Sequence, residues 1–123
     1  MKPLVLLAAA VLGASTATVL ACGVCAEDKV AATYDYATIQ RAGARGRTMV
    51  FCAIEGRYDA AKVKRAARQV RGVDGSTVRV SSELSAVSFA LDTKAQSPQA
   101  AVSALQAEAP KGTKFKILKV IAP

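Results

Sequence analysis

Residues 48–54 (TMVFCAI) are apolar at every position after the first and combine β-branched with aromatic side chains. This composition predicts a β-strand, which Glu55-Gly56 ends. Side chains alternate between the two faces of a strand. One face would carry Val50, Cys52 and Ile54, and the other Met49, Phe51 and Ala53. A half-exposed strand would have polar residues on one face, so we expect this strand to lie in a sheet that is covered on both sides.

Helix and strand signals alternate along the rest of the chain. In order, we expect a helix at 59–71, strands at 76–81 and 87–91, a helix at 97–108 and a strand at 114–121. Asp59 is a favourable N-cap for the first helix, and Ser97-Pro98 is a favourable start for the second. The order β-α-β-β-α-β predicts the α+β class and a ferredoxin-like sandwich, with one antiparallel sheet and two helices on one face.

An extra N-terminal helix is predicted before this unit, at residues 26–42 (AEDKVAATYDYATIQRA). Glu27 and Asp28 lie in its first turn and Arg41 in its last, which suits the helix dipole at both ends. We expect this helix to cover part of the second face of the sheet. Residues 43–47 (GARGR) would form a basic connector between the two parts.

The first 21 residues have the three-part layout of a secretory signal. A short positive start precedes an apolar core at residues 4–14, which is too short to span a bilayer, and small residues follow at the cleavage positions. We therefore expect three parts: a signal peptide at 1–21, a Cys-x-x-Cys segment with helix and connector at 22–47, and a ferredoxin-like domain at 48–123. The protein would be exported, either periplasmic or secreted.

Two fates of Cys22 remain open. The sequence Val19-Leu20-Ala21-Cys22 resembles the lipobox of bacterial lipoproteins, which would place a lipid on Cys22 and make the protein a membrane-anchored lipoprotein. Ordinary cleavage after Ala17 or Ala21 would instead leave a free thiol, and the polar residues between the apolar core and Cys22 favour this outcome. Membrane association is expected only for the lipidated form.

Composition excludes several classes of function. The sequence has no histidine, which rules out histidine-dependent triads and histidine zinc sites. It also has no phosphate-binding glycine motif and no recognisable acid/base pair, so we do not expect an enzyme. The formal net charge is +8. In an exported protein this basicity indicates solvation, an anionic envelope component or an acidic partner rather than nucleic acid.

Three short segments carry a resemblance to a known family. They are Ile54-Glu55-Gly56 before a helix, Val70-Arg71-Gly72-Val73, and Val78-Arg79-Val80. With them, residues 48–120 resemble the heavy-metal-associated domain of copper chaperones and of the periplasmic mercury-binding protein. In that family the loop after the first strand contains Gly-Met-x-Cys-x-x-Cys, and both cysteines bind the metal. Here Asp59 and Lys62 occupy the two cysteine positions, and we interpret them as a helix cap and a solvated charge.

A different Cys-x-x-Cys pair, Cys22-Gly23-Val24-Cys25, precedes the N-terminal helix. Thiolates are suited to soft metals, and a helix N-terminus lowers thiol pKa values. The leading prediction is that Cys22 and Cys25 bind Cu(I) or another soft metal ion and exchange it with a metal-donor or acceptor protein. The alternative is a lipid-anchored or secreted interaction module without metal, which would dock through its sheet or its basic helix. A thiol–disulfide oxidoreductase is a third and weaker possibility.

Cys52 is predicted to be a small buried hydrophobe, because it shares a face with Val50 and Ile54. Two functional alternatives stay open, a third metal ligand and a disulfide partner. Three cysteines in an oxidising compartment leave one unpaired, and a lipid on Cys22 would leave Cys25 and Cys52 to pair.

Overall fold

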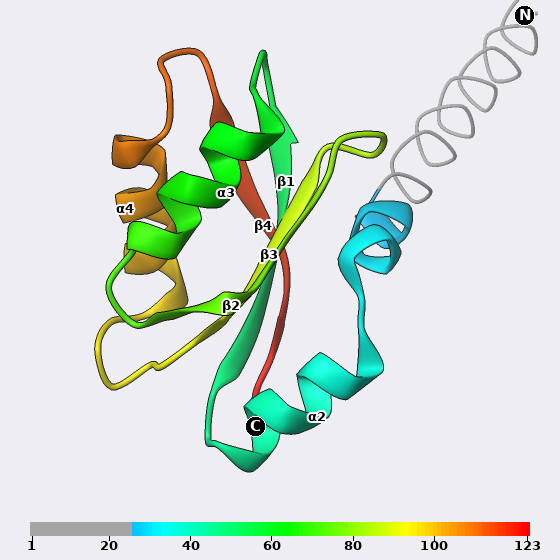
Figure 1. The fold of residues 1–123 in the computed structure, drawn as a ribbon, viewed down its shortest axis with the longest axis vertical. Coiled ribbons are helices and arrows are strands. Elements are labelled where there is room, and N and C mark those ends of the chain that lie inside the picture. The colour runs from blue at the N-terminus through cyan, green and yellow to red at the C-terminus, as the bar shows by residue number, and fades with distance from the viewer. Residues whose placement is uncertain (1–25) are drawn as a thin grey trace, which may run out of the picture.

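The structure, a computed structural model, describes residues 26–123. Its centre is a four-stranded sheet in the order β2-β3-β1-β4, and every neighbouring pair is antiparallel (Figure 1). The strands are β1 (Thr48–Glu55), β2 (Val73–Ser81), β3 (Ala86–Leu91) and β4 (Lys114–Ile121). The helices are α2 (Tyr36–Ala44), α3 (Ala60–Gln69) and α4 (Pro98–Glu108), and residues 26–33 are also helical. The predicted β-α-β-β-α-β order and ferredoxin-like sandwich are confirmed.

Helices α3 and α4 cover one face of the sheet (Figure 1). Each begins at a side-chain cap, because Asp59 accepts from the backbone of α3 and Ser97 accepts from Ala100 N at 3.1 Å. Apolar side chains from both helices meet those of the strands in the main core. Its fully buried members include Val50, Cys52, Val63, Ala67, Phe89, Leu91 and Leu105. This face therefore forms the two-layer packing expected of the fold.

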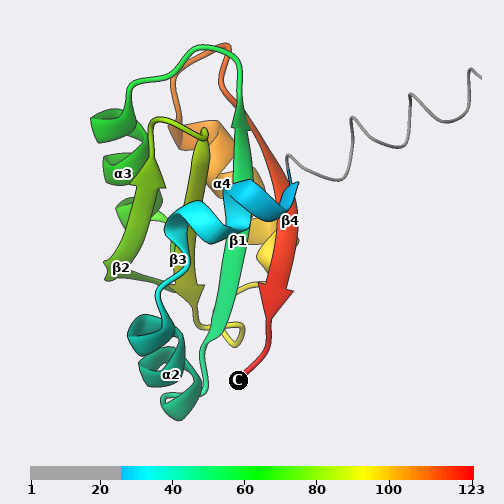
Figure 2. The same cartoon turned by 90° about the vertical axis from the view of Figure 1, so that its right-hand side faces the viewer.

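The second face of the sheet is covered by residues 26–33 and α2 (Figure 2). Met49 and Phe51 are 3% and 1% exposed, and with Ala42 and Ala90 they form a second, smaller core. Lys29 fixes the first helical segment to the β2–β3 turn, since its Nζ donates to Leu84 O at 2.8 Å. The expectation that the N-terminal part covers the apolar second face of β1 is confirmed.

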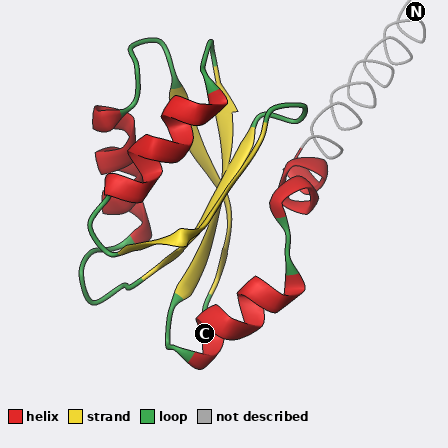
Figure 3. Cartoon of the chain, viewed as in Figure 1, coloured by secondary structure: helices red, strands yellow, loops and turns green. Residues whose placement is uncertain are grey.

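The prediction of one continuous helix over residues 26–42 was wrong. Figure 3 shows two helical segments, and the chain between them, at residues 34–35, is extended. Asp35 lies at the break with φ −138° and ψ 110°, and its Oδ2 binds Arg79 Nη2 on β2 at 2.6 Å as well as the Thr38 hydroxyl. Because the sheet is twisted, two short segments follow its surface where one straight helix would leave it. Tyr34, at the break, is 49% exposed.

Within residues 26–123, no helix combines the length and the apolar character needed to cross a bilayer. The predicted signal peptide at 1–21 and the lipobox at 19–22 lie outside the described residues.

Candidate functional site

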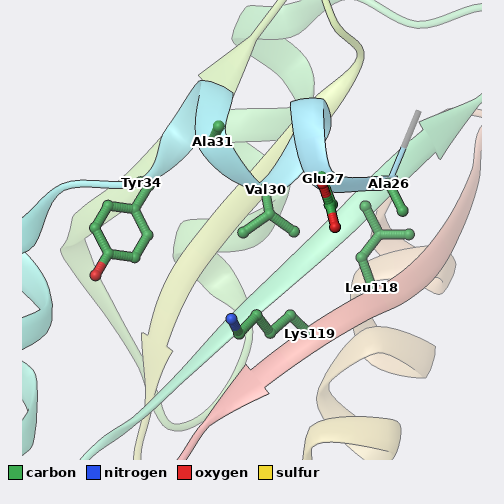
Figure 4. A pocket seen from close by; sticks show the side chains of 7 residues that line it. All are labelled: Ala26, Glu27, Val30, Ala31, Tyr34, Leu118 and Lys119. Atoms are coloured by element: carbon green, nitrogen blue, oxygen red, sulfur yellow. The ribbon is translucent and has the colours of Figure 1, made fainter. Parts of the chain in front are cut away.

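The predicted metal ligands Cys22 and Cys25 lie outside the described residues. The described part of the chain begins at Ala26, which lies beside the edge strand β4. There a hollow of about 590 Å³ separates the first helical segment from β4 (Figure 4). Its lining residues are Ala26, Glu27, Val30, Ala31, Tyr34, Leu118 and Lys119. The part of the chain that follows the cysteine pair is thus placed at the edge of the sheet.

This hollow is mostly apolar, with one charged group of each sign. Figure 4 shows Val30 and Glu27 projecting from the helical segment toward the strands, where Lys119 of β4 lies. Tyr34 closes one end, and its ring stacks on Phe51 with 6.3 Å between the ring centroids. Its lining contains no sulfur atom. Among residues 26–123, no group of three or more Cys, Asp or Glu side chains is arranged to hold a metal ion.

The loop between β1 and α3, which contains Asp59, has a structural role in this chain. Asp59 Oδ1 accepts hydrogen bonds from Ala61 N at 2.9 Å and Lys62 N at 3.3 Å, so it caps α3 as predicted. Lys62 is exposed. A carboxylate that already accepts two backbone hydrogen bonds and a solvated ammonium offer no site for a soft cation.

The other residues of the loop between β1 and α3 are held by contacts with neighbouring loops. Gly56 has φ +85°, and a Cβ atom there would clash with the carbonyl oxygen of Gly112. The Thr113 hydroxyl donates to Arg57 O at 2.8 Å, and the Tyr58 hydroxyl donates to Ser82 O at 3.2 Å. The segment therefore joins the β2–β3 turn to the residues before β4.

Cys52 is a buried free thiol, as predicted from its register. It is 1% exposed and packs in the main core on the α3–α4 side of the sheet, whereas residues 26–33 lie on the other side. Burial raises the pKa of the Cys52 thiol to about 12. The thiol is therefore protonated at neutral pH and has no access to solvent. The alternative in which Cys52 is an accessible third metal ligand is wrong for this fold.

A cluster of arginines between α2 and β2 was not predicted as a unit. Arg47 Nη1 binds Asp74 Oδ2 at 2.6 Å, and Arg45 Nη1 lies 3.9 Å from the same oxygen. The hydrogen bonds from Ser76, together with the nearby arginines, lower the pKa of Asp74 despite partial desolvation. The hydrogen bond from Thr38, with Arg79 beside it, likewise lowers the pKa of Asp35. One feature of the sequence could have indicated this cluster, the arginine-rich connector at 43–47.

Comparison with known proteins finds similarity at the level of solved structures only. No family model and no curated protein matches the chain. Oxidized MerP from Ralstonia metallidurans CH34 is 22% identical, with a TM-score of 0.49 over 58% of this chain and 99% of that one. The N-terminal domain of PacS from Synechocystis PCC6803 is 24% identical, with a TM-score of 0.45 over 58% of this chain and 97% of that one. A third, described as "Crosstalk between Cu(I) and Zn(II) homeostasis", is 21% identical with a TM-score of 0.44, over 56% and 96% of the two chains. Similarity at this level carries no argument about function.

Proposed function

We propose that this is an exported, non-catalytic protein that binds a soft metal ion, with Cu(I) as the first candidate, through Cys22 and Cys25. The metal would pass to or from a partner protein by exchange of thiolate ligands, because a two-thiolate site leaves room for a third sulfur from the partner. Residues 26–123 would serve as the domain that carries and presents this pair.

The observation that supports the proposal most directly is the position of Cys52. The chain has three cysteines. Cys52 is buried in the main core, and burial raises the pKa of its thiol. Cys22 and Cys25 are therefore the only thiols left for soft-metal chemistry. The loop that would hold cysteines in heavy-metal-associated domains is occupied by the Asp59 cap, so a metal site in this chain requires other residues.

The attachment of residues 26–33 to the sheet also supports this role. Lys29 binds the β2–β3 turn and Val30 packs against the second core, so the residues directly after Cys25 are held by the domain. Cleavage after Ala21 would make Cys22 the first residue of the mature chain, and the pair would precede a helical segment. The partial positive charge at a helix N-terminus stabilises thiolates, the form that binds Cu(I).

Two measurements test the proposal. The intact mass of protein purified from cell envelopes reports the cleavage site and any lipid on Cys22. Anaerobic Cu(I) titration in the presence of a competing chelator then compares the processed wild type with Cys22→Ser and Cys25→Ser. We expect one Cu(I) per chain for the wild type and a loss of binding in either variant, since one thiolate cannot complete a two-coordinate site.

Cys52→Ala is the matched control, because it removes a thiol that the fold already hides from solvent. It should bind Cu(I) like the wild type. A diacylglycerol group on Cys22 would refute the two-thiolate site, and so would Cu(I) affinity that is unchanged in both serine variants.

The second candidate is an interaction module of the same fold that docks through its basic helix. Lys62, Arg65 and Arg68 on α3 are exposed, and the ion pairs of the described residues involve none of them. This basic surface is free to meet an acidic partner. If the serine variants keep every cellular interaction while Arg65→Glu loses them, the interaction module is the better description.

A further inference from the structure

A small polar hollow lies between α2 and β2, on the side of the molecule where the N-terminal part meets the sheet. Its volume is about 70 Å³. The lining residues are Thr38, Arg41, Ala42, Arg45, Asp74, Ser76, Thr77 and Arg79. Three of these side chains are cationic and one is anionic, so the lining has an excess of positive charge.

Asp74 offsets only part of this excess. Its Oδ1 accepts from both the backbone N and the hydroxyl of Ser76, at 3.1 and 2.7 Å. Its Oδ2 accepts from Arg47 at 2.6 Å, and Arg47 is not a lining residue. Arg45 Nη1 lies 3.9 Å from Oδ2, which is beyond hydrogen-bond distance. The carboxylate is thus committed to Ser76 and Arg47, and Arg45 keeps its donors.

The other two lining arginines also have donors to spare. Arg41 makes one long contact, from Nη2 to the Thr38 hydroxyl at 3.5 Å. Arg79 uses Nη2 for Asp35 and Thr38. A guanidinium carries five N–H donors in a fixed planar arrangement, so most of the donors around the hollow remain available. Planar pairs of N–H groups are the preferred partners of phosphate oxygens.

We infer that this hollow binds a tetrahedral oxyanion of the phosphate class, held by Arg41, Arg45 and Arg79. The hollow, at about 70 Å³, is small and suits a compact anion. The phosphate would be inorganic phosphate or the phosphomonoester headgroup of a lipid. This inference is independent of the metal proposal.

The C-terminal end of α2 opposes anion binding, because a helix C-terminus carries roughly half a negative charge. Two features limit that effect. The carbonyl of Ala42 accepts from Arg47 N at 2.8 Å, and the carbonyl of Arg41 accepts from Arg45 N at 3.2 Å, so the last-turn oxygens are already satisfied. Arg41, Arg45, Arg47 and Arg79 also outnumber the two carboxylates of the junction, Asp35 and Asp74, and the remaining positive charge exceeds that of the helix end.

The test is calorimetric titration of the processed full-length protein with inorganic phosphate, at constant ionic strength maintained with sodium chloride. We expect saturable binding of one phosphate per chain. Arg45→Gln and Arg41→Gln should each weaken the affinity about tenfold, which corresponds to about 1.4 kcal/mol. Both residues are exposed and neither makes a hydrogen bond shorter than 3.5 Å through its side chain, so the variants should fold normally.

Arg65→Gln is the matched control, because it removes the same charge from an exposed position on α3. It should change phosphate affinity by less than about twofold, since α3 lies on the other face of the sheet and salt screens long-range electrostatics. Vesicles of phosphatidylcholine with phosphatidic acid or phosphatidylglycerol distinguish the sources. If the protein prefers vesicles with phosphatidic acid and loses this preference in Arg45→Gln, the ligand is a lipid headgroup. If it binds inorganic phosphate but no vesicles, the ligand is free phosphate. No saturable heat at constant ionic strength, or an equal loss in Arg65→Gln, overturns the inference.

Discussion

Phe51 offers the most direct test of how the N-terminal part stabilises the domain. Phe51 is 1% exposed on β1, one of the two inner strands, between Tyr34 and the rest of the second core. A buried phenylalanine removes about 150–250 Å² from water, and about 25 cal/mol per Å² gives about 4–6 kcal/mol as an upper value. Measured Phe→Ala losses in cores are about 3–5 kcal/mol. We expect Phe51→Ala to lower the free energy of unfolding by about 4 kcal/mol.

Urea unfolding followed by circular dichroism measures this loss in the processed protein, with the m-value checked for two-state behaviour. Phe51→Leu is the control, because it keeps much of the volume and should lose less than about 1.5 kcal/mol. Hydrogen exchange adds a local readout, since amides of residues 26–44 should lose protection in Phe51→Ala. A loss below about 1.5 kcal/mol for Phe51→Ala would refute the reasoning, because it would mean that the second face is already open to water in solution.

Three further predictions follow from single side chains. Asp59→Ala should lower the free energy of unfolding by about 1 kcal/mol in urea, through the lost N-cap, whereas Asp59→Asn keeps an acceptor and should lose much less. Equal losses would argue against the cap. In a Cys22→Ser, Cys25→Ser background, Cys52 should resist Ellman's reagent at pH 8 and react only after urea is added, because its pKa is raised to about 12 and it is buried. Rapid labelling of the native protein would contradict its burial. The pKa of Asp74 is lowered in the fold, so its contribution to stability is present above the unfolded pKa of about 3.9 and disappears as pH falls through the lower folded pKa. Urea midpoints measured from pH 5 down to pH 2 should therefore fall less steeply for Asp74→Asn than for the wild type, and parallel profiles would exclude this role.

Features that depend on neighbouring residues could be predicted from the sequence. The Asp59 cap involves backbone groups two and three positions away, and Ser97 caps α4 in the same way. The burial of Cys52 and Phe51 on opposite faces followed from strand alternation, because the period of two fixes the face once the strand is located. The order β-α-β-β-α-β then indicated the ferredoxin-like sandwich, which is the common arrangement of these elements.

Features that depend on distant partners could not be predicted. The helix break at Tyr34-Asp35 has no glycine or proline to mark it, and the Arg79 side chain that holds Asp35 is 44 residues away. The arginine-lined hollow is a similar case. Arg45 lies in the predicted connector and Asp74 precedes the strand predicted at 76–81, and only the docking of α2 on β2 brings them within 3.9 Å. The Cys22–Cys25 pair stays a prediction from sequence, since it lies outside the described residues.

Docking of α2 on β2 connects these features thermodynamically. The Arg47–Asp74 and Arg79–Asp35 ion pairs join the N-terminal part to β2, and the hollow lies in the same junction. A phosphate bound there would contact Arg41 on α2, Arg45 at its C-cap and Arg79 on β2, so it would bind only the docked arrangement. Such a ligand stabilises docking by about 2.7 kcal/mol when its concentration is about 100 times its dissociation constant. Because residues 26–44 also cover Phe51, an anion in the hollow would stabilise the part of the chain that covers the second face of the sheet.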